Sequence, residues 1–234
     1  MGKMSKRYRQ ARETVMADKK YTLEESCGLV KELANASFDE TVEIAISLNV
    51  NPKYADQMVR GSCILPNGTG KTARVAVFAS GEKADKAKEA GADIVGDEDL
   101  AAKIQEGWLE FDVVIASPNM MRTVGKLGRI LGPRGLMPNP KIGTVTDEVA
   151  EAVKEAKAGK ISFRVDKTGN LHVPVGKASF EKKALAENVM SFFEKVLQLR
   201  PSTVKGQYMK NISVSSTMGP GIKIDMNDLR AQIR

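Results

Sequence analysis

The stretch LPNGTGKTARVAVF, Leu65 to Phe78, is the point at which the pattern of the sequence changes. Before it, residues 42–48 and 59–65 are rich in β-branched residues, and 42–48 alternates apolar and polar side chains as in a half-buried strand. After Pro66 to Gly68, short apolar strands alternate with charged helices, which is typical of a parallel sheet covered by helices. We therefore predict that a second domain begins at Gly68.

The same stretch contains Gly70-Lys71-Thr72, which matches the end of a phosphate-binding P-loop. In the full motif, G-x-x-x-x-G-K-[ST], the loop follows a strand and its Lys and Thr open a helix. Here Leu65 replaces the first glycine, and Lys71 precedes a predicted strand at residues 73–79. The spacing favours a turn that leads into a strand, and a nucleotide-dependent enzyme stays as an alternative.

The predicted second domain contains three strands and four helices. The strands span residues 73–79, 93–96 and 111–117, and the helices span 82–90, 97–106, 120–130 and 147–157. Thr146 is expected to cap the last helix, and Gly159 is expected to end it. These elements predict an α/β Rossmann-like domain with three layers.

Both ends of the chain have a different pattern. At the start we expect helices over residues 6–17 and 23–35, the second opened by a capping box of Thr22 and Glu25. After Gly159 we expect a hairpin over 160–176 with its turn at Asp166 to Asn170, a helix over 180–197 and a strand over 208–217.

The economical architecture is an α+β outer domain, an antiparallel sheet with helices built from both chain ends. It takes residues 1–67 and 159–234, and the α/β domain, residues 68–158, is inserted between them. The two connections, Pro66 to Gly68 and Ala158 to Lys160, are expected to act as a hinge, because domains joined in this way commonly move relative to each other.

Three windows of the sequence lack Asp and Glu, and each carries five Lys or Arg residues. They span residues 1–12, beginning with Lys3, 113–146 and 195–224, and the rest of the chain has a net charge of −8 although the whole has +7. Because an ordinary solvated face mixes both signs, separated basic windows favour a polyanionic partner, above all a nucleic acid. A membrane surface is a weaker alternative, since no segment is apolar enough to span a bilayer and no basic helix has an aromatic face.

The residue types needed for side-chain catalysis are scarce. The chain has one histidine, His172, and two cysteines, Cys27 and Cys63, which are too few for a zinc site and suit a reducing cytosol. We therefore expect no catalytic residue, no metal and no cofactor.

Three stretches are candidates for binding. Residues 125–145 are rich in Gly, Pro and basic residues without an acid, which suits phosphate contacts, although a mobile lid or linker is the alternative. On the predicted hairpin, Ser162, Arg164 and His172 leave the apolar face and Lys167 lies on the turn, as a cationic platform or an ordinary solvated face. Residues 213–221, SVSSTMGPG, offer hydroxyl and backbone groups that suit RNA, or form a simple turn.

Six stretches taken in order resemble a known family. They are FDETVE (38–43), DQMVRG (56–61), LPNGTGKTARVAVF (65–78), GKLGRILGPRGLMPNPKIGTV (125–145), KISFRVDKTGNLHVPVGKASF (160–180) and STMGPG (216–221). The family is that of bacterial ribosomal protein L-one, found in the mobile stalk beside the tRNA exit site of the large subunit. The resemblance covers essentially the whole chain, with departures at Asn67, where His is common, and Met58, where Asn is usual.

The resemblance implies a cytoplasmic, ribosome-associated protein that binds large-subunit ribosomal RNA and performs no catalysis. It further implies that the stalk assists release of deacylated tRNA from the exit site and that the protein represses translation by binding its own operon mRNA leader. A repressor that acts away from the ribosome would use the same surface. The implied RNA-binding residues are Phe38, Thr41, Arg164, Lys167, His172, Ser215, Thr217, Met218 and Gly219, with secondary contacts from Arg129, Arg134 and Lys141.

Overall fold

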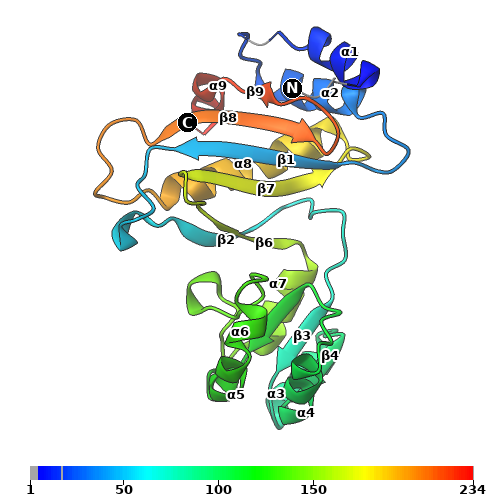
Figure 1. Ribbon diagram of the computed structural model, residues 1–234, viewed down its shortest axis with the longest axis vertical. Helices are drawn as coiled ribbons and strands as arrows, with labels where there is room; N and C mark the ends of the chain where they lie inside the picture. The colour runs from blue at the N-terminus through cyan, green and yellow to red at the C-terminus, as the bar shows by residue number, and fades with distance from the viewer. Residues whose placement is uncertain (1–4, 17, 234) are drawn as a thin grey trace. The chain divides into compact units, whose positions relative to one another are not determined.

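The computed structural model describes residues 5–16 and 18–233, and these form two compact units (Figure 1). Unit 1 comprises Met1–Gly70 and Phe163–Arg234, and unit 2 comprises Lys71–Ser162. Lys3 of the first basic window, and Ala17, where the first helix was expected to end, lie outside the described residues. Among the helices that are described, none combines the length and apolar character needed to cross a membrane.

Unit 1 is built on a four-stranded sheet with the order β7-β1-β8-β9 (Figure 1). All its pairings are antiparallel, with β1 (Thr41–Leu48) between β7 (Asn170–Lys177) and β8 (Met209–Ser216), and β9 (Ile222–Lys223) beside β8. Alternate residues of β1, from Val42 to Leu48, are buried, as the sequence pattern predicts. Helices α2 (Leu23–Leu33) and α8 (Lys182–Gln198) pack against this sheet, and α1 (Lys6–Thr14) and α9 (Met226–Gln232) complete the helices of the unit.

The predicted capping box at the start of α2 is confirmed. The Thr22 hydroxyl accepts the Glu25 N–H at 3.3 Å, and the Glu25 carboxylate accepts the Thr22 N–H at 3.2 Å. These two bonds satisfy backbone donors that have no partner within the first turn of a helix. Both cysteines are buried and free, and burial raises the pKa of Cys27 to about 12, so its thiol is held neutral.

The hairpin predicted over residues 160–176 is wrong in its strand pairing. The tight turn is present, because Asp166 N–H donates to Asn170 O at 2.8 Å, but β6 (Lys160–Arg164) pairs with β2 (Arg60–Ile64) while β7 pairs with β1. The two strands therefore belong to different sheets. Both still present apolar residues to α8, since Phe163 of β6 packs edge-on against Phe192 with ring centroids 5.0 Å apart.

Close packing between β2 and its neighbours explains Gly61. A Cβ atom at this position would lie 2.7 Å from Leu199 Cδ1 and 3.2 Å from Phe163 Cζ. Such distances are shorter than side chains tolerate without movement, so the glycine allows the β2–β6 ribbon to approach α8. A short 3-10 turn, Ala55–Gln57, precedes this ribbon.

A buried amide anchors the chain where it leaves unit 1. Asn188 of α8 is fully buried, and its side chain accepts the Asn67 N–H at 3.0 Å and donates to Gly68 O at 3.0 Å and Val175 O at 2.7 Å. Because all three bonds are internal, this side chain satisfies backbone groups that water does not reach. Residues 67 and 68 are therefore fastened to α8.

Unit 2 contains a three-stranded parallel sheet with the order β4-β3-β5. Its strands are β3 (Val75–Phe78), β4 (Ile94–Gly96) and β5 (Val113–Ala116), and its longer helices are α3 (Glu82–Glu89), α4 (Glu98–Gln105) and α7 (Val149–Lys157). One face of the sheet packs on α3 and α7 through Val75, Val77 and Val153, and the other packs on α4 and its neighbours through Phe78 and Ile104. The predicted alternation of strands and helices is thus confirmed.

The helix predicted over residues 120–130 is interrupted. The chain forms a 3-10 turn at Pro118–Met120, α5 (Met121–Lys126), a break at Leu127, and α6 (Gly128–Leu131). The basic segment 125–145 was expected to contain no regular core element, and this is also wrong. Leu127 and Leu131 are fully buried in the core under the sheet, and Ile142 is buried in the 3-10 turn Pro140–Ile142, because apolar residues interrupt the glycines at helical spacing.

The start of α7 also differs from the prediction. The helix begins at Val149, and Thr146 accepts the Glu148 N–H at 3.1 Å from outside the helix instead of acting as its N-cap. Asp147 forms an ion pair with Lys83 at 2.6 Å. A local Ser/Thr turn therefore replaces the expected cap.

Candidate nucleic-acid interface

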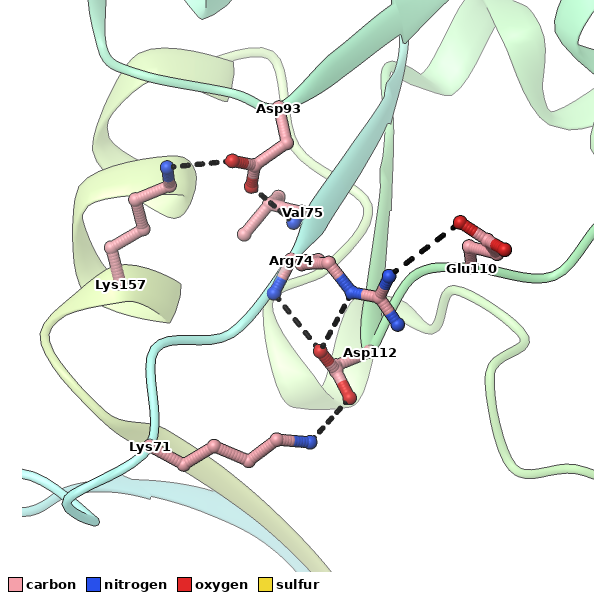
Figure 2. A network of polar contacts seen from close by, with 7 residues as sticks. All are labelled: Lys71, Arg74, Val75, Asp93, Glu110, Asp112 and Lys157. Atoms are coloured by element: carbon pink, nitrogen blue, oxygen red, sulfur yellow. Dashed lines mark hydrogen bonds and ion pairs between the residues drawn. The ribbon is translucent and has the colours of Figure 1, made fainter.

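The lysine of the P-loop-like stretch is occupied by an ion pair (Figure 2). Lys71 Nζ lies 2.6 Å from Asp112 Oδ1, and the other oxygen of Asp112 accepts the Arg74 N–H at 3.0 Å. The Lys71 side chain, followed by these two backbone and side-chain contacts, lowers the pKa of Asp112. Lys71 precedes strand β3 and opens no helix, so the order expected from the sequence is confirmed and the stretch lacks the geometry of a phosphate loop.

A second aspartate performs the same task on the other side of β3 (Figure 2). Asp93 precedes β4, and its carboxylate accepts the Val75 N–H at 2.8 Å and pairs with Lys157 at 3.3 Å. The Val75 N–H, followed by Lys157, lowers the pKa of Asp93 against the opposing effect of its burial. The two aspartates thus fasten the start of β3 to both neighbouring strands, which accounts for the charge in this region without a ligand.

In unit 1, the face of the four-stranded sheet opposite the helices is polar and open. Because alternate residues of β1 are buried, Thr41, Glu43, Ala45 and Ser47 point to this other face. Ala45 lies opposite His172 on β7 and Ser213 on β8, and Glu43 lies opposite Ser215 on β8. We call this face the open sheet face; it contains two predicted site residues, His172 and Ser215.

The remaining hydroxyl and apolar candidates meet at one end of the same sheet. The Thr217 hydroxyl accepts the Thr41 N–H at 3.0 Å and donates to Thr41 O at 3.2 Å, so strands β1 and β8 are joined there. Phe38 lies just before β1 and is 53% exposed, and Met218 lies just after β8 and is 50% exposed. We call Phe38, Thr41, Thr217, Met218 and Gly219 the sheet-end surface.

A buried carboxylate lies beneath the sheet-end surface. Glu40 is only 1% exposed, and its two oxygens accept the Ala36 N–H at 3.0 Å and the Met218 N–H at 2.9 Å. Burial by itself would raise the pKa of Glu40, but the bonds from Met218, the Ser216 hydroxyl and Ala36, with the charge of Arg7, lower it below its ordinary value. Glu40 is therefore ionised at neutral pH and holds the segments carrying Phe38 and Met218 in one arrangement.

A cation borders this surface. Lys177, opposite Thr41 on β7, places Nζ 2.9 Å from Thr41 Oγ1 and 3.4 Å from Asp39 O. Asp39 in turn accepts the Ser179 N–H at 3.1 Å and the Ser179 hydroxyl at 2.8 Å. These contacts fix the backbone on either side of Phe38.

The predicted cationic platform of Ser162, Arg164 and His172 does not form on one sheet. His172 is exposed on the open sheet face, whereas Ser162 and Arg164 are exposed residues of β6 in the β2–β6 ribbon. Lys167 is exposed on the turn that joins β6 to β7, where Asp166 accepts bonds from Thr168 and Asn170. Turning the chain at Asp166 into a second sheet separates what the sequence had suggested was one face.

The secondary candidates in unit 2 are all solvent-exposed. Arg129 belongs to α6, Arg134 follows it, and Lys141 lies in the 3-10 turn whose start is capped by Asn139. Between these cations, Leu131 and Ile142 are buried and hold the backbone. The basic segment is therefore an ordered surface rather than a linker.

Sequence reasoning missed Glu40 and Lys177. An acid beside FDETVE carries no signal of burial, and the partners of both residues come from distant parts of the chain, which only strand register brings together. Within residues 5–16 and 18–233, no three His, Cys, Asp or Glu side chains gather as a potential metal site.

Comparison with known families identifies the chain. A model described as the ribosomal protein L1p/L10e family matches residues 30–220, which is most of the sequence and includes the whole sheet-end surface. Proteins of this family are structural components of the ribosome rather than enzymes. The chain therefore belongs to the ribosomal protein L1p/L10e family and is a ribosome-associated protein that binds ribosomal RNA of the large subunit.

Proposed function

We propose that the sheet-end surface and the adjoining open sheet face are the principal binding site for large-subunit ribosomal RNA. The observation that carries this proposal is the pair of half-exposed apolar side chains, Phe38 and Met218, which are held in place from below by the ionised Glu40. Exposed apolar residues on a rigid polar surface are typical of binding sites. Prior organisation also reduces the entropy lost on binding.

Each group in this surface has a contact that it can make with RNA. The Phe38 ring can stack on an unpaired base, and Met218 can pack against a sugar or base. The Thr217 hydroxyl already uses its proton and one lone pair on Thr41, so it acts chiefly by fixing the position of the Met218-Gly219 edge. Ser215, on the open sheet face, can bond a 2′-hydroxyl.

Phosphate contacts come from the flanking cations. Arg164, Lys167 and His172 are exposed residues of unit 1, and we assign them to positioning the RNA backbone rather than to reading bases. Binding through these cations weakens as salt rises, because bound counterions are released from the RNA.

The test is an equilibrium titration of an rRNA fragment across a salt series. Phe38→Ala and Met218→Ala are each expected to weaken binding by about 1–3 kcal/mol with little change in salt slope. Met16→Ala is a matched control, since Met16 is 68% exposed in another part of unit 1. If Phe38→Ala and Met218→Ala both bind like the native protein, the proposed surface is wrong.

We further propose that unit 2 adds weaker contacts through Arg129, Arg134 and Lys141. Replacing all three by Gln removes three exposed cations while leaving the buried Leu131 and Ile142 in place. The salt slope is expected to fall by up to about three, with less loss of affinity than Phe38→Ala causes. A complete loss of binding in this triple variant would place the principal site in unit 2 instead.

Division of the chain into two units supports a role as the mobile stalk that assists release of deacylated tRNA from the exit site. We infer a bacterial type of discontinuous outer domain, 1–67 with 159–234, and inserted domain, 68–158. Because Asn188 fastens residues 67 and 68, the pivot in the first connection would lie after Gly68. Fluorescence energy transfer between dyes on the two units of ribosome-bound protein tests this, and a distance that stays constant as exit-site tRNA binds and leaves would contradict it.

The same surface also suits repression of translation through the protein's own mRNA leader in the cytoplasm. Repression is tested with a reporter fused to that leader. The Phe38→Ala variant is expected to relieve repression in parallel with its loss of rRNA affinity. Ribosome sedimentation distinguishes a ribosomal protein from a repressor that acts away from the ribosome.

A further inference from the structure

Two arginines lie side by side at one end of the β2–β6 ribbon. Val165 N–H donates to Val59 O at 2.9 Å, which joins the residue after β6 to the residue before β2. Arg60, the first residue of β2, and Arg164, the last of β6, are the next residues on the two strands. Their side chains are close enough that the charge of Arg164 acts on Arg60.

This pair has no acidic partner among the described residues. The nearest acid along the chain, Asp166, uses its carboxylate to accept bonds from Thr168 and Asn170 in its own turn. The Arg164 guanidinium instead lies 3.4 Å from the sulfur of Met58, which is at best a weak acceptor. No ion pair is formed by either arginine in the described part of the chain.

Placing two like charges together destabilises the folded protein. Burial, followed by the charge of Arg164, lowers the pKa of Arg60, which shows that its positive charge is disfavoured where it lies. Like charges on adjacent strands are destabilising in general, and an unpaired, partly buried charge adds to the cost. A bound anion would remove both penalties.

We propose that Arg60 and Arg164 together bind one phosphate group of the RNA backbone. Two planar guanidinium groups provide several N–H donors in the forked geometry that fits phosphate oxygens, and the phosphate would screen the two positive charges from each other. The inference rests on the proposed RNA-binding function of unit 1 and adds Arg60, which the sequence motifs did not single out as a site residue. Met58 supports the pair by packing against Arg164.

The experiment compares the full chain with Arg60→Gln, Arg164→Gln and the double variant, using the same rRNA fragment and salt series. Each single variant is expected to weaken binding about tenfold, as removal of a charge-assisted hydrogen bond does. The double variant is expected to lower the salt slope by about one, since one phosphate is lost. Lys183→Gln, an exposed cation of α8, is the matched control and should bind like the native protein.

A second measurement, made without RNA, detects the predicted repulsion. Arg60→Gln is expected to melt at the same or a higher temperature than the native protein at low salt, and the difference should shrink as added salt screens the two charges. This readout also shows whether the variant is folded. A purely structural role for Arg60 predicts the opposite, a lower melting temperature.

The outcomes separate this inference from the proposed function. If Phe38→Ala weakens binding but Arg60→Gln leaves affinity and salt slope unchanged, the arginine pair binds no phosphate and the proposed surface survives. If neither substitution has an effect, the proposed surface itself is wrong. A fall of about two in the slope of the double variant would overturn the shared site, because it would show two separate phosphates.

Discussion

Met218 N–H donates a 2.9 Å hydrogen bond to the buried Glu40 carboxylate, which joins residues 178 positions apart in the sequence. The other oxygen of the same carboxylate accepts the Ala36 N–H. One side chain therefore fixes the segments before β1 and after β8, which carry the two exposed apolar residues of the sheet-end surface. Because these bonds hold backbone rather than side chains, they set where Phe38 and Met218 begin.

Glu40→Gln is expected to destabilise the protein by about 1–3 kcal/mol, because an amide offers one acceptor oxygen where the carboxylate offers two. RNA affinity should fall together with stability, since the sheet-end surface loses its support. Urea unfolding and the rRNA titration measure the two effects. Glu32→Gln is the control, because Glu32 is exposed on α2, and an unchanged affinity in Glu40→Gln would show that the carboxylate does not organise the surface.

Gly219→Ala is expected to distort the same surface by steric overlap. A Cβ atom at Gly219 would lie 2.5 Å from Ser216 Oγ, whereas a Cβ atom at Gly221 would meet no atom within 4 Å. Gly219→Ala should therefore cost about 1–3 kcal/mol of stability, as overpacking does, and weaken RNA binding. Gly221→Ala is the matched control, and Ser216→Ala combined with Gly219→Ala should recover part of the loss; equal effects of the two single glycine variants would contradict the argument.

The Lys71–Asp112 pair predicts unequal effects at its two ends. The Lys71 side chain is 68% exposed, so losing its ion pair in Lys71→Ala should cost only about 0.2–1 kcal/mol. Asp112→Ala also leaves the Arg74 N–H without its acceptor, so a larger loss of about 1–3 kcal/mol is expected. Chemical unfolding measures both, and a larger effect of Lys71→Ala on stability would show that the lysine has another task.

The same lysine tests the nucleotide alternative. Native protein titrated with magnesium and ATP in the absence of RNA is expected to show no saturable binding, because Lys71 precedes a strand and is paired with Asp112. Saturable binding that Lys71→Ala abolishes would revive the enzyme interpretation.

Asp166 should contribute to acid sensitivity. The Asn170 N–H and the Thr168 hydroxyl lower its pKa from the ordinary value of 3.8 to about 2. Because the folded-state pKa is the lower one, the stabilisation is complete above about pH 4 and is lost as the pH falls through about 2. Asp166→Asn should thus show a flatter fall in unfolding free energy over this range.

The control for acid sensitivity is Asp56→Asn, which alters an exposed aspartate in the 3-10 turn before β2. Its pH profile is expected to run parallel to that of the native protein. Parallel profiles for Asp166→Asn as well would contradict the assigned role of the turn. Folding is followed by circular dichroism at each pH.

Local patterns in the sequence predicted individual elements well. The alternation in β1, the capping box of Thr22 and Glu25 and the α/β pattern after Gly70 are confirmed, because each depends on residues a few positions apart. Predictions that involved competing partners were less accurate. Thr146 was expected to cap α7 and forms a turn instead, and buried Leu127 and Leu131 belong to a segment predicted to lack core residues.

The sequence by itself determined the type of most elements, the family to which the chain belongs and the segregation of its basic residues, because these follow from local order and composition. Only the tertiary structure decided strand partners and the surroundings of Glu40 and Arg60. The pattern of residues 160–176 suits a hairpin, yet β6 and β7 join different sheets because each finds a longer-range partner. Glu40 and Arg60 gain their character from Met218 and Arg164, and contacts across more than a hundred residues leave no periodic signal in the sequence.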